Sequence, residues 1–172
     1  MGVLLIWIAS VVASTRMSYP GSSVSTDPTG SWSIEWLEAT QDTPHRLLLK
    51  DRKTDKVVPL YEFDRHVDVL WAPDGTAVAI TDYAGSNESL IYVIHPNKPS
   101  ARIDIEQSLI ATLGNIPALY ENGHRYFEAI KWLRPTILRF RIHAYDAHPG
   151  VLYQGVFEFN LRTGKVHQVK RR

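Results

Sequence analysis

The chain of 172 residues contains no cysteine. Disulfide bonds, thiolate zinc sites, cysteine nucleophiles and a lipid-anchored cysteine are therefore excluded. Net charge is also small, because 19 Lys and Arg stand against 18 Asp and Glu. This balance removes the electrostatic basis for binding nucleic acid or an acidic membrane surface. The ten glycines are scattered singly, so no glycine-rich phosphate-binding loop is present, and neither a G-x-S-x-G nor an H-E-x-x-H motif occurs.

Long apolar runs are missing as well. The uncharged segment 1–13 (MGVLLIWIASVVA) is too short to span a membrane, which needs about 20 residues. It fits the apolar part of a signal peptide or N-terminal anchor, although no basic residue precedes Arg16. A buried first strand is the alternative interpretation. Residues 14–30 are rich in Ser, Thr, Gly and Pro and are expected to form a linker. This order predicts a periplasmic or secreted protein.

Two short motifs recur along the chain. Asp27-Pro28-Thr29-Gly30 matches Ala72-Pro73-Asp74-Gly75 at a spacing of 45 residues, and an alternating strand pattern follows each. Residues 50–57 match residues 159–166, since each segment is a strand that enters a polar turn and leaves it with Lys and Val. We therefore expect three related units near 27–62, 63–105 and 124–170, each built from several short strands.

The strand patterns are bounded by turn residues of the usual kind. The predicted strands are 31–37, 46–50 and 56–61 in the first unit; 67–71, 77–82, 89–94 and 101–105 in the second; and 126–132, 137–145, 151–160 and 165–169 in the third. One segment, 104–123, departs from this pattern. It has a capping-box spacing between Asp104 and Gln107 and an apolar stripe at helical spacing. A helix of two to three turns is expected there.

The middle unit resembles the TolB-type or WD-like β-propeller repeat, strongly only over Trp71 to Val93. Blades of that family read Trp-Ser-Pro-Asp-Gly, then a strand ending in Ser/Thr-Asp, a Gly-Asn turn and Ile-Tyr. The corresponding residues are here Trp71-Ala72-Pro73-Asp74-Gly75, Thr81-Asp82, Gly85-Ser86-Asn87 and Ile91-Tyr92. The resemblance implies an all-β fold of three propeller-like antiparallel sheets, an open or partial propeller, over 31–172 with the helical insertion at 104–123. It also implies that Trp71 fills the wedge between blades.

Closed propellers have about 4–8 blades, whereas three units are counted here. The first unit also lacks an obvious innermost strand. Two arrangements follow: an open stack capped by 104–123, or a homodimer that completes a ring.

Histidines are the residues that first suggest chemistry. His66 and Asp68 flank Val67 and share one strand face, where they are close enough to form a hydrogen bond. His143 and His148 differ by five positions, so on a strand they point to opposite faces unless the turn at 146–150 reorients one of them. We therefore predict no metal site and no cofactor, and a solvated strand end remains the alternative for His66.

A binding face is the better hypothesis, because the loops expected at one end of the units are rich in Tyr, His, Asn, Asp and Arg. The predicted binding residues are Arg65, His66, Asp82, Tyr83, Asn87, His124, Tyr126, Tyr145, Asp146 and His148. The expected function is a non-catalytic binding or scaffold domain of an exported protein, and the alternative is a small hydrolase with acid/base residues on the same face. A protein partner is expected, with carbohydrate and peptide as the other candidates.

Overall fold

Three antiparallel groups of four strands make up most of the molecule. The computed structural model describes residues 16–22, 24–121, 123–145 and 151–170. The first unit contains β2 (Val24–Thr26), β3 (Trp32–Leu37), β4 (His45–Asp51) and β5 (Val57–Phe63). The second contains β6 (Val67–Trp71), β7 (Val78–Asp82), β8 (Glu88–Ile94) and β9 (Arg102–Asp104). The third contains β10 (His124–Arg134), β11 (Ile137–Tyr145), β12 (Val151–Asn160) and β13 (Lys165–Gln168).

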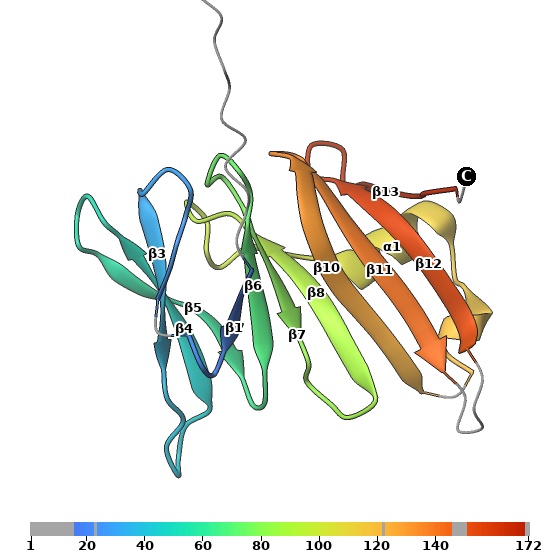
Figure 1. The fold of residues 1–172 in the computed structure, drawn as a ribbon, viewed down its shortest axis with the longest axis horizontal. Helices are drawn as coiled ribbons and strands as arrows, with labels where there is room; N and C mark the ends of the chain where they lie inside the picture. The colour runs from blue at the N-terminus through green and yellow to red at the C-terminus, as the bar shows by residue number, and fades with distance from the viewer. Residues whose placement is uncertain (1–15, 23, 122, 146–150, 171–172) are drawn as a thin grey trace, which may run out of the picture.

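This arrangement confirms the predicted fold class, an all-β propeller-like structure with one short helical insertion. Figure 1 shows the three units side by side, and the described residues do not close them into a ring. The second and third units are joined by a short parallel pairing, in which Arg125 and Tyr126 of β10 lie beside Glu88 and Ser89 of β8. Hydrogen bonding is therefore continuous across both units, while β2–β5 form a separate sheet.

The middle unit is buried on both faces. All five residues of β6 and all five of β7 are buried. Because side chains alternate along a strand, Val69 and Trp71 pack toward the first unit while Leu70 and Ala79 pack toward the third. Trp71 thus fills the space between the first and second units, as the family resemblance implied.

The sequence repeats correspond to repeated turns. Gly30 and Gly75 both have positive φ, +76° and +70°, and both donate their N–H groups to the carbonyl three residues earlier. In the second motif, the Asp51 side chain accepts hydrogen bonds from the N–H groups of the residues two and three positions ahead, and Asn160 does the same in the third unit. Asp55 (φ 58°) and Gly164 (φ 67°) occupy the same left-handed position in these two turns.

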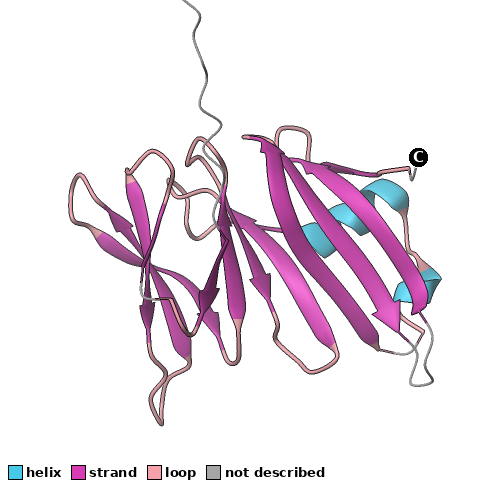
Figure 2. Ribbon diagram, in the orientation of Figure 1, coloured by secondary structure: helices cyan, strands magenta, loops and turns pink. Residues whose placement is uncertain are grey.

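The predicted helix is present as α1 (Ile105–Leu113), followed by the short 3₁₀ helix η1 (Pro117–Leu119). Asp104 caps its N-terminus by accepting a hydrogen bond from the N–H of Gln107, and Gly114 ends it with φ 78°. Ile105 and Leu109 are buried in the core that the second and third units share. Figure 2 shows the helix behind the strands of the third unit, the position of a cover over that core.

Two strands lie in the segment 14–30 for which a linker was expected. β1 (Arg16–Tyr19) pairs antiparallel with β6, and β2 supplies the innermost strand that the first unit was expected to lack. Each of these short strands buries one side chain in the protein, Tyr19 from β1 and Ser25 from β2. The predicted signal or anchor, residues 1–13, lies outside the described residues. Within the described part of the chain, no helix is long and apolar enough to cross a membrane.

Candidate functional site

Described loops of the second and third units lie at the lower end of the molecule in Figure 1. His66 precedes β6, Tyr83 follows β7, Tyr126 lies near the start of β10 and Tyr145 ends β11. Reversing strands place all four positions at one end of the sheets, as the sequence analysis expected.

Asp68 is the centre of a hydrogen-bond network at this end. Its side chain is buried, yet Oδ1 accepts from the Ser18 hydroxyl at 2.6 Å and lies 3.2 Å from Nε2 of His66. Oδ2 accepts from the Tyr83 hydroxyl at 3.2 Å and lies 3.5 Å from Nη1 of Arg16. The rings of His66 and Tyr83 are also in contact, with centroids 4.9 Å apart. The predicted pairing of His66 with Asp68 is therefore present, and β1 contributes two of the four partners of Asp68, Arg16 and Ser18.

The Tyr83 hydroxyl has a raised pKa. Burial is the largest cause, and the negative charges of Asp68 and Glu128 add to it. Tyr83 therefore stays a neutral hydrogen-bond donor.

Three aromatic side chains gather beside this network on β10 and β11. Tyr126 stacks on His143 with centroids 5.0 Å apart, and Tyr145 meets His143 edge-on at 5.1 Å. The Tyr126 hydroxyl donates to the carbonyl of Ser86 at 2.8 Å, which ties the third unit to the β7–β8 loop. Tyr145 remains 40% exposed. Burial lowers the pKa of His143 and the negative charge of Glu128 partly opposes this change.

An ion pair lies between the two groups. Nε of Arg141 donates to Oε2 of Glu128 at 3.0 Å. Arg16, which lies beside Asp68, also donates to the carbonyl of Ala129, the neighbour of Glu128 on β10, so the network around Asp68 and the aromatic group belong to one area. We call this area the His/Tyr surface, and it consists of His66, Asp68, Tyr83, Tyr126, Glu128, Arg141, His143 and Tyr145.

The other residues that were predicted to bind lie partly near the His/Tyr surface and partly away from it. Arg65 and Asn87 are exposed on adjacent loops, and His124 pairs across the sheet with Tyr145. Asp82 does not lie on the surface: it is buried and accepts a hydrogen bond from Tyr61 at 2.7 Å. Burial raises its pKa. Asp146 and His148 lie outside the described residues.

Four residues of the His/Tyr surface were absent from the predicted set: Asp68, Glu128, Arg141 and His143. Three of them could have been found from the alternation of side chains along a strand, which places every second residue on the same face. Glu128 follows Tyr126 by two positions, and Arg141 and His143 precede Tyr145 by four and two positions on the same face of β11.

The network around Asp68 does not have the order needed for nucleophilic catalysis. A serine nucleophile requires a histidine base that is itself oriented by a carboxylate. Here the Ser18 hydroxyl donates to Asp68 directly, so the carboxylate and not the imidazole is in the middle. Among the residues that the structure describes, no group of three or more His, Asp or Glu side chains is arranged to hold a metal ion.

No family model and no curated protein matches the chain. Among solved structures, it is similar to TolB from Acinetobacter baumannii, with a TM-score of 0.44 and 14% identity over 86% of this chain and 32% of that chain. It is also similar to a chain from a structural and mechanistic study of two prolyl endopeptidases, with a TM-score of 0.35 and 8% identity over 93% of this chain and 29% of that chain. The chain therefore spans about a third of the length of these proteins.

Proposed function

We propose that this protein is a non-catalytic binding domain that uses the His/Tyr surface to bind another protein outside the cytoplasm. The observation that supports this proposal best is the group Tyr126, His143 and Tyr145. These rings are held by packing and by the hydrogen bond from Tyr126 to Ser86, yet they keep part of their surface open to solvent. Tyrosine supplies a large contact area at low entropic cost, which is why it is enriched at protein interfaces.

The flanking polar groups fit the same role. The Glu128–Arg141 pair places one charge of each sign beside the rings, and Arg141 is exposed and can exchange its partner for a carboxylate of a bound protein. The buried Asp68 network holds His66 and Tyr83 in fixed positions at the edge of the area. Fixed side chains lose little conformational entropy when a partner binds.

The experiment compares a double variant, Tyr126→Ala with Tyr145→Ala, with the wild type and a matched control. The control is Leu37→Ala with Val57→Ala, which removes two exposed apolar side chains (41% and 46% exposed) from the first unit. Each purified protein is used for quantitative cross-linking in an extract of the exported fraction. We expect the wild type and the control to capture the same protein, and the tyrosine variant to capture at least about fivefold less of it.

Two results would overturn the proposal. Equal capture by all three proteins would show that the His/Tyr surface is not the binding face. An esterase or peptidase activity that His66→Ala abolishes would instead support the hydrolase alternative. The mass of the protein purified from the exported fraction also tests the proposed location, because it shows where the chain begins after export.

A further inference from the structure

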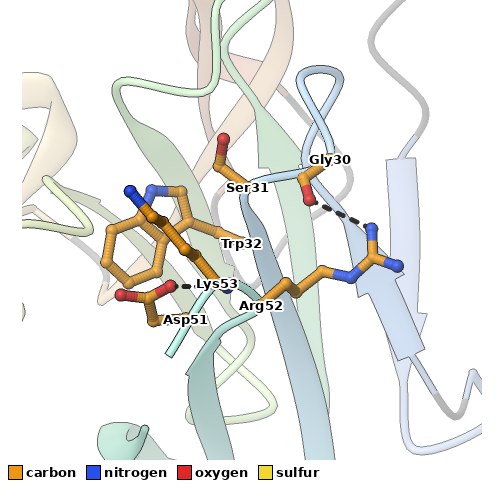
Figure 3. Close-up of a pocket in the computed structure, with 6 residues that line it drawn as sticks. All are labelled: Gly30, Ser31, Trp32, Asp51, Arg52 and Lys53. Carbon is orange, nitrogen blue, oxygen red and sulfur yellow. Dashed lines mark hydrogen bonds between the residues drawn. The ribbon is translucent and has the colours of Figure 1, made fainter. Parts of the chain in front are cut away.

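The turns at the opposite end of the first unit border two hollows that share Trp32. The larger hollow, about 510 Å³, is lined by Gly30, Ser31, Trp32, Asp51, Arg52 and Lys53 (Figure 3). The smaller, about 210 Å³, is lined by Trp32, Leu49, Asp51, Lys56, Val58, Pro96, Asn97 and Pro99. The half-buried Trp32 side chain thus borders both spaces, and the second is largely apolar.

Cationic side chains line these hollows in excess. The linings contain three cationic residues, Arg52, Lys53 and Lys56, and a single carboxylate, that of Asp51. The Asp51 carboxylate is already engaged, because it accepts the N–H groups of Lys53 and Thr54 at 2.8 and 3.2 Å. These hydrogen bonds lower its pKa and fix it in the turn.

The three cations differ in what they contact. Figure 3 shows the Arg52 guanidinium directed to the Gly30 carbonyl, to which it donates at 3.1 Å. Among the described residues, the ammonium groups of Lys53 and Lys56 have neither an ion pair nor a hydrogen bond, and Lys53 acts on Asp51 only through its charge. They are therefore available to an anion.

We propose that Trp32, Lys53 and Lys56 form a binding site for a small aromatic anion, distinct from the His/Tyr surface. The flat ring of the ligand packs against the Trp32 indole and the apolar wall formed by Leu49, Val58 and the two prolines. Its anionic group lies toward the lysine ammonium groups. The volume of the larger hollow, about 510 Å³, lies within the range of about 300–1,000 Å³ that is usual for ligand pockets.

Three probes that share one ring and differ in charge test this site: indole-3-acetate, indole-3-acetamide and tryptamine. Binding is followed by NMR from the indole N–H signal of Trp32, which Trp32→Phe identifies. We expect a saturable shift with the anion, at least about fivefold weaker binding of the neutral amide, and weaker binding still of the cation. Lys53→Gln with Lys56→Gln should bring the three affinities together.

The repeat provides a matched control. Arg162 and Lys165 occupy the equivalent turn of the third unit, so Arg162→Gln with Lys165→Gln changes net charge equally and should leave the preference for the anion intact. Three results would overturn the proposal: no saturable shift at about 10 mM anion, equal affinity for all three probes in the wild type, or loss of the preference in the control variant. Circular dichroism of each variant shows whether the fold is retained.

Discussion

The indole nitrogen of Trp71 donates a hydrogen bond to the hydroxyl of Ser25, 3.0 Å away, across the contact between the second and first units. Both side chains are buried, with 2% and 3% exposure. The bond therefore fixes the short strand β2 to the end of β6.

Trp71→Ala should lower the free energy of unfolding by about 3–5 kcal/mol, because a large buried ring is removed and a cavity remains. Ser25→Ala should cost about 1 kcal/mol, the net value of one hydrogen bond. Urea denaturation measures both. In a Trp71→Phe background, Ser25→Ala should cost less, since its partner is already absent. A melting temperature within about 3 °C of the wild type for Trp71→Ala would contradict this interpretation.

Two glycines with the same backbone conformation should differ in their tolerance of alanine. A Cβ at Gly75 would clash with Oδ2 of Asp27, whereas a Cβ at Gly30 would meet Nη1 of Arg52 at 3.5 Å, an ordinary contact. Asp27 cannot move easily, because Oδ2 accepts from the N–H of Thr29 at 2.9 Å. Gly30→Ala should therefore cost about 1–2 kcal/mol of backbone strain, and Gly75→Ala at least about 2 kcal/mol more. Equal costs in urea denaturation would refute the close approach.

The carboxylate of Asp68 should contribute more to stability than an exposed carboxylate. Asp68→Ala leaves Ser18, His66 and Tyr83 without their acceptor and should cost about 2–4 kcal/mol. Asp42→Ala, at an exposed loop position, should stay within about 0.5 kcal/mol of the wild type. Denaturant titration of both variants is the measurement, and a cost below about 1 kcal/mol for Asp68→Ala would show that the network is weak.

Asp82 should make stability fall as pH rises. Burial raises its pKa in the folded protein above the ordinary 3.8, so above that pH the folded state holds a proton that the unfolded state has released. The resulting penalty is absent below 3.8 and complete once pH exceeds the raised pKa. Asp82→Asn removes the titration and keeps an acceptor for Tyr61. The stability of the variant relative to the wild type should therefore increase as the pH rises above the ordinary pKa of 3.8, and a constant difference would exclude this effect.

His143 provides a direct probe of the His/Tyr surface. Burial holds its pKa below the ordinary 6.5, while Glu128 raises it. Glu128→Gln should therefore lower the pKa further, as followed by the imidazole signals in NMR. Glu62→Gln, at an exposed position of β5, should leave it unchanged. A rise of the pKa in Glu128→Gln would show that the carboxylate does not act on this imidazole.

Most strands were predictable because their determinants are local. Turn residues such as Pro73 and Gly75 mark the strand ends, and the Asp104–Gln107 spacing marks the start of α1. β1 and β2 were missed for a physical reason. They are only four and three residues long, and the partner of β1 is residues 67–70, far away in the sequence. A segment of three or four residues is too short to show the alternation of apolar and polar side chains, and a distant partner strand adds no local signal.

In the candidate site, too, some positions were predictable from local sequence and others depended on distant contacts. The positions of His66, Tyr126 and Tyr145 follow from which loops share an end of the sheets. The burial of Asp82 does not, because it depends on Tyr61 from the first unit covering the end of β7. The role of Asp68 likewise depends on β1, which contributes Arg16 and Ser18.

The position of β1 also restricts the order in which the chain can fold. Arg16 pairs with Leu70 and Tyr19 with Val67, so everything that forms the first unit is synthesised between two adjoining strands. A chain that emerges from its N-terminus cannot complete this pairing until β6 has appeared. The sheet of the second unit therefore gains its edge strand β1 only after the whole first unit has been synthesised, whereas the separate sheet β2–β5 does not depend on this pairing.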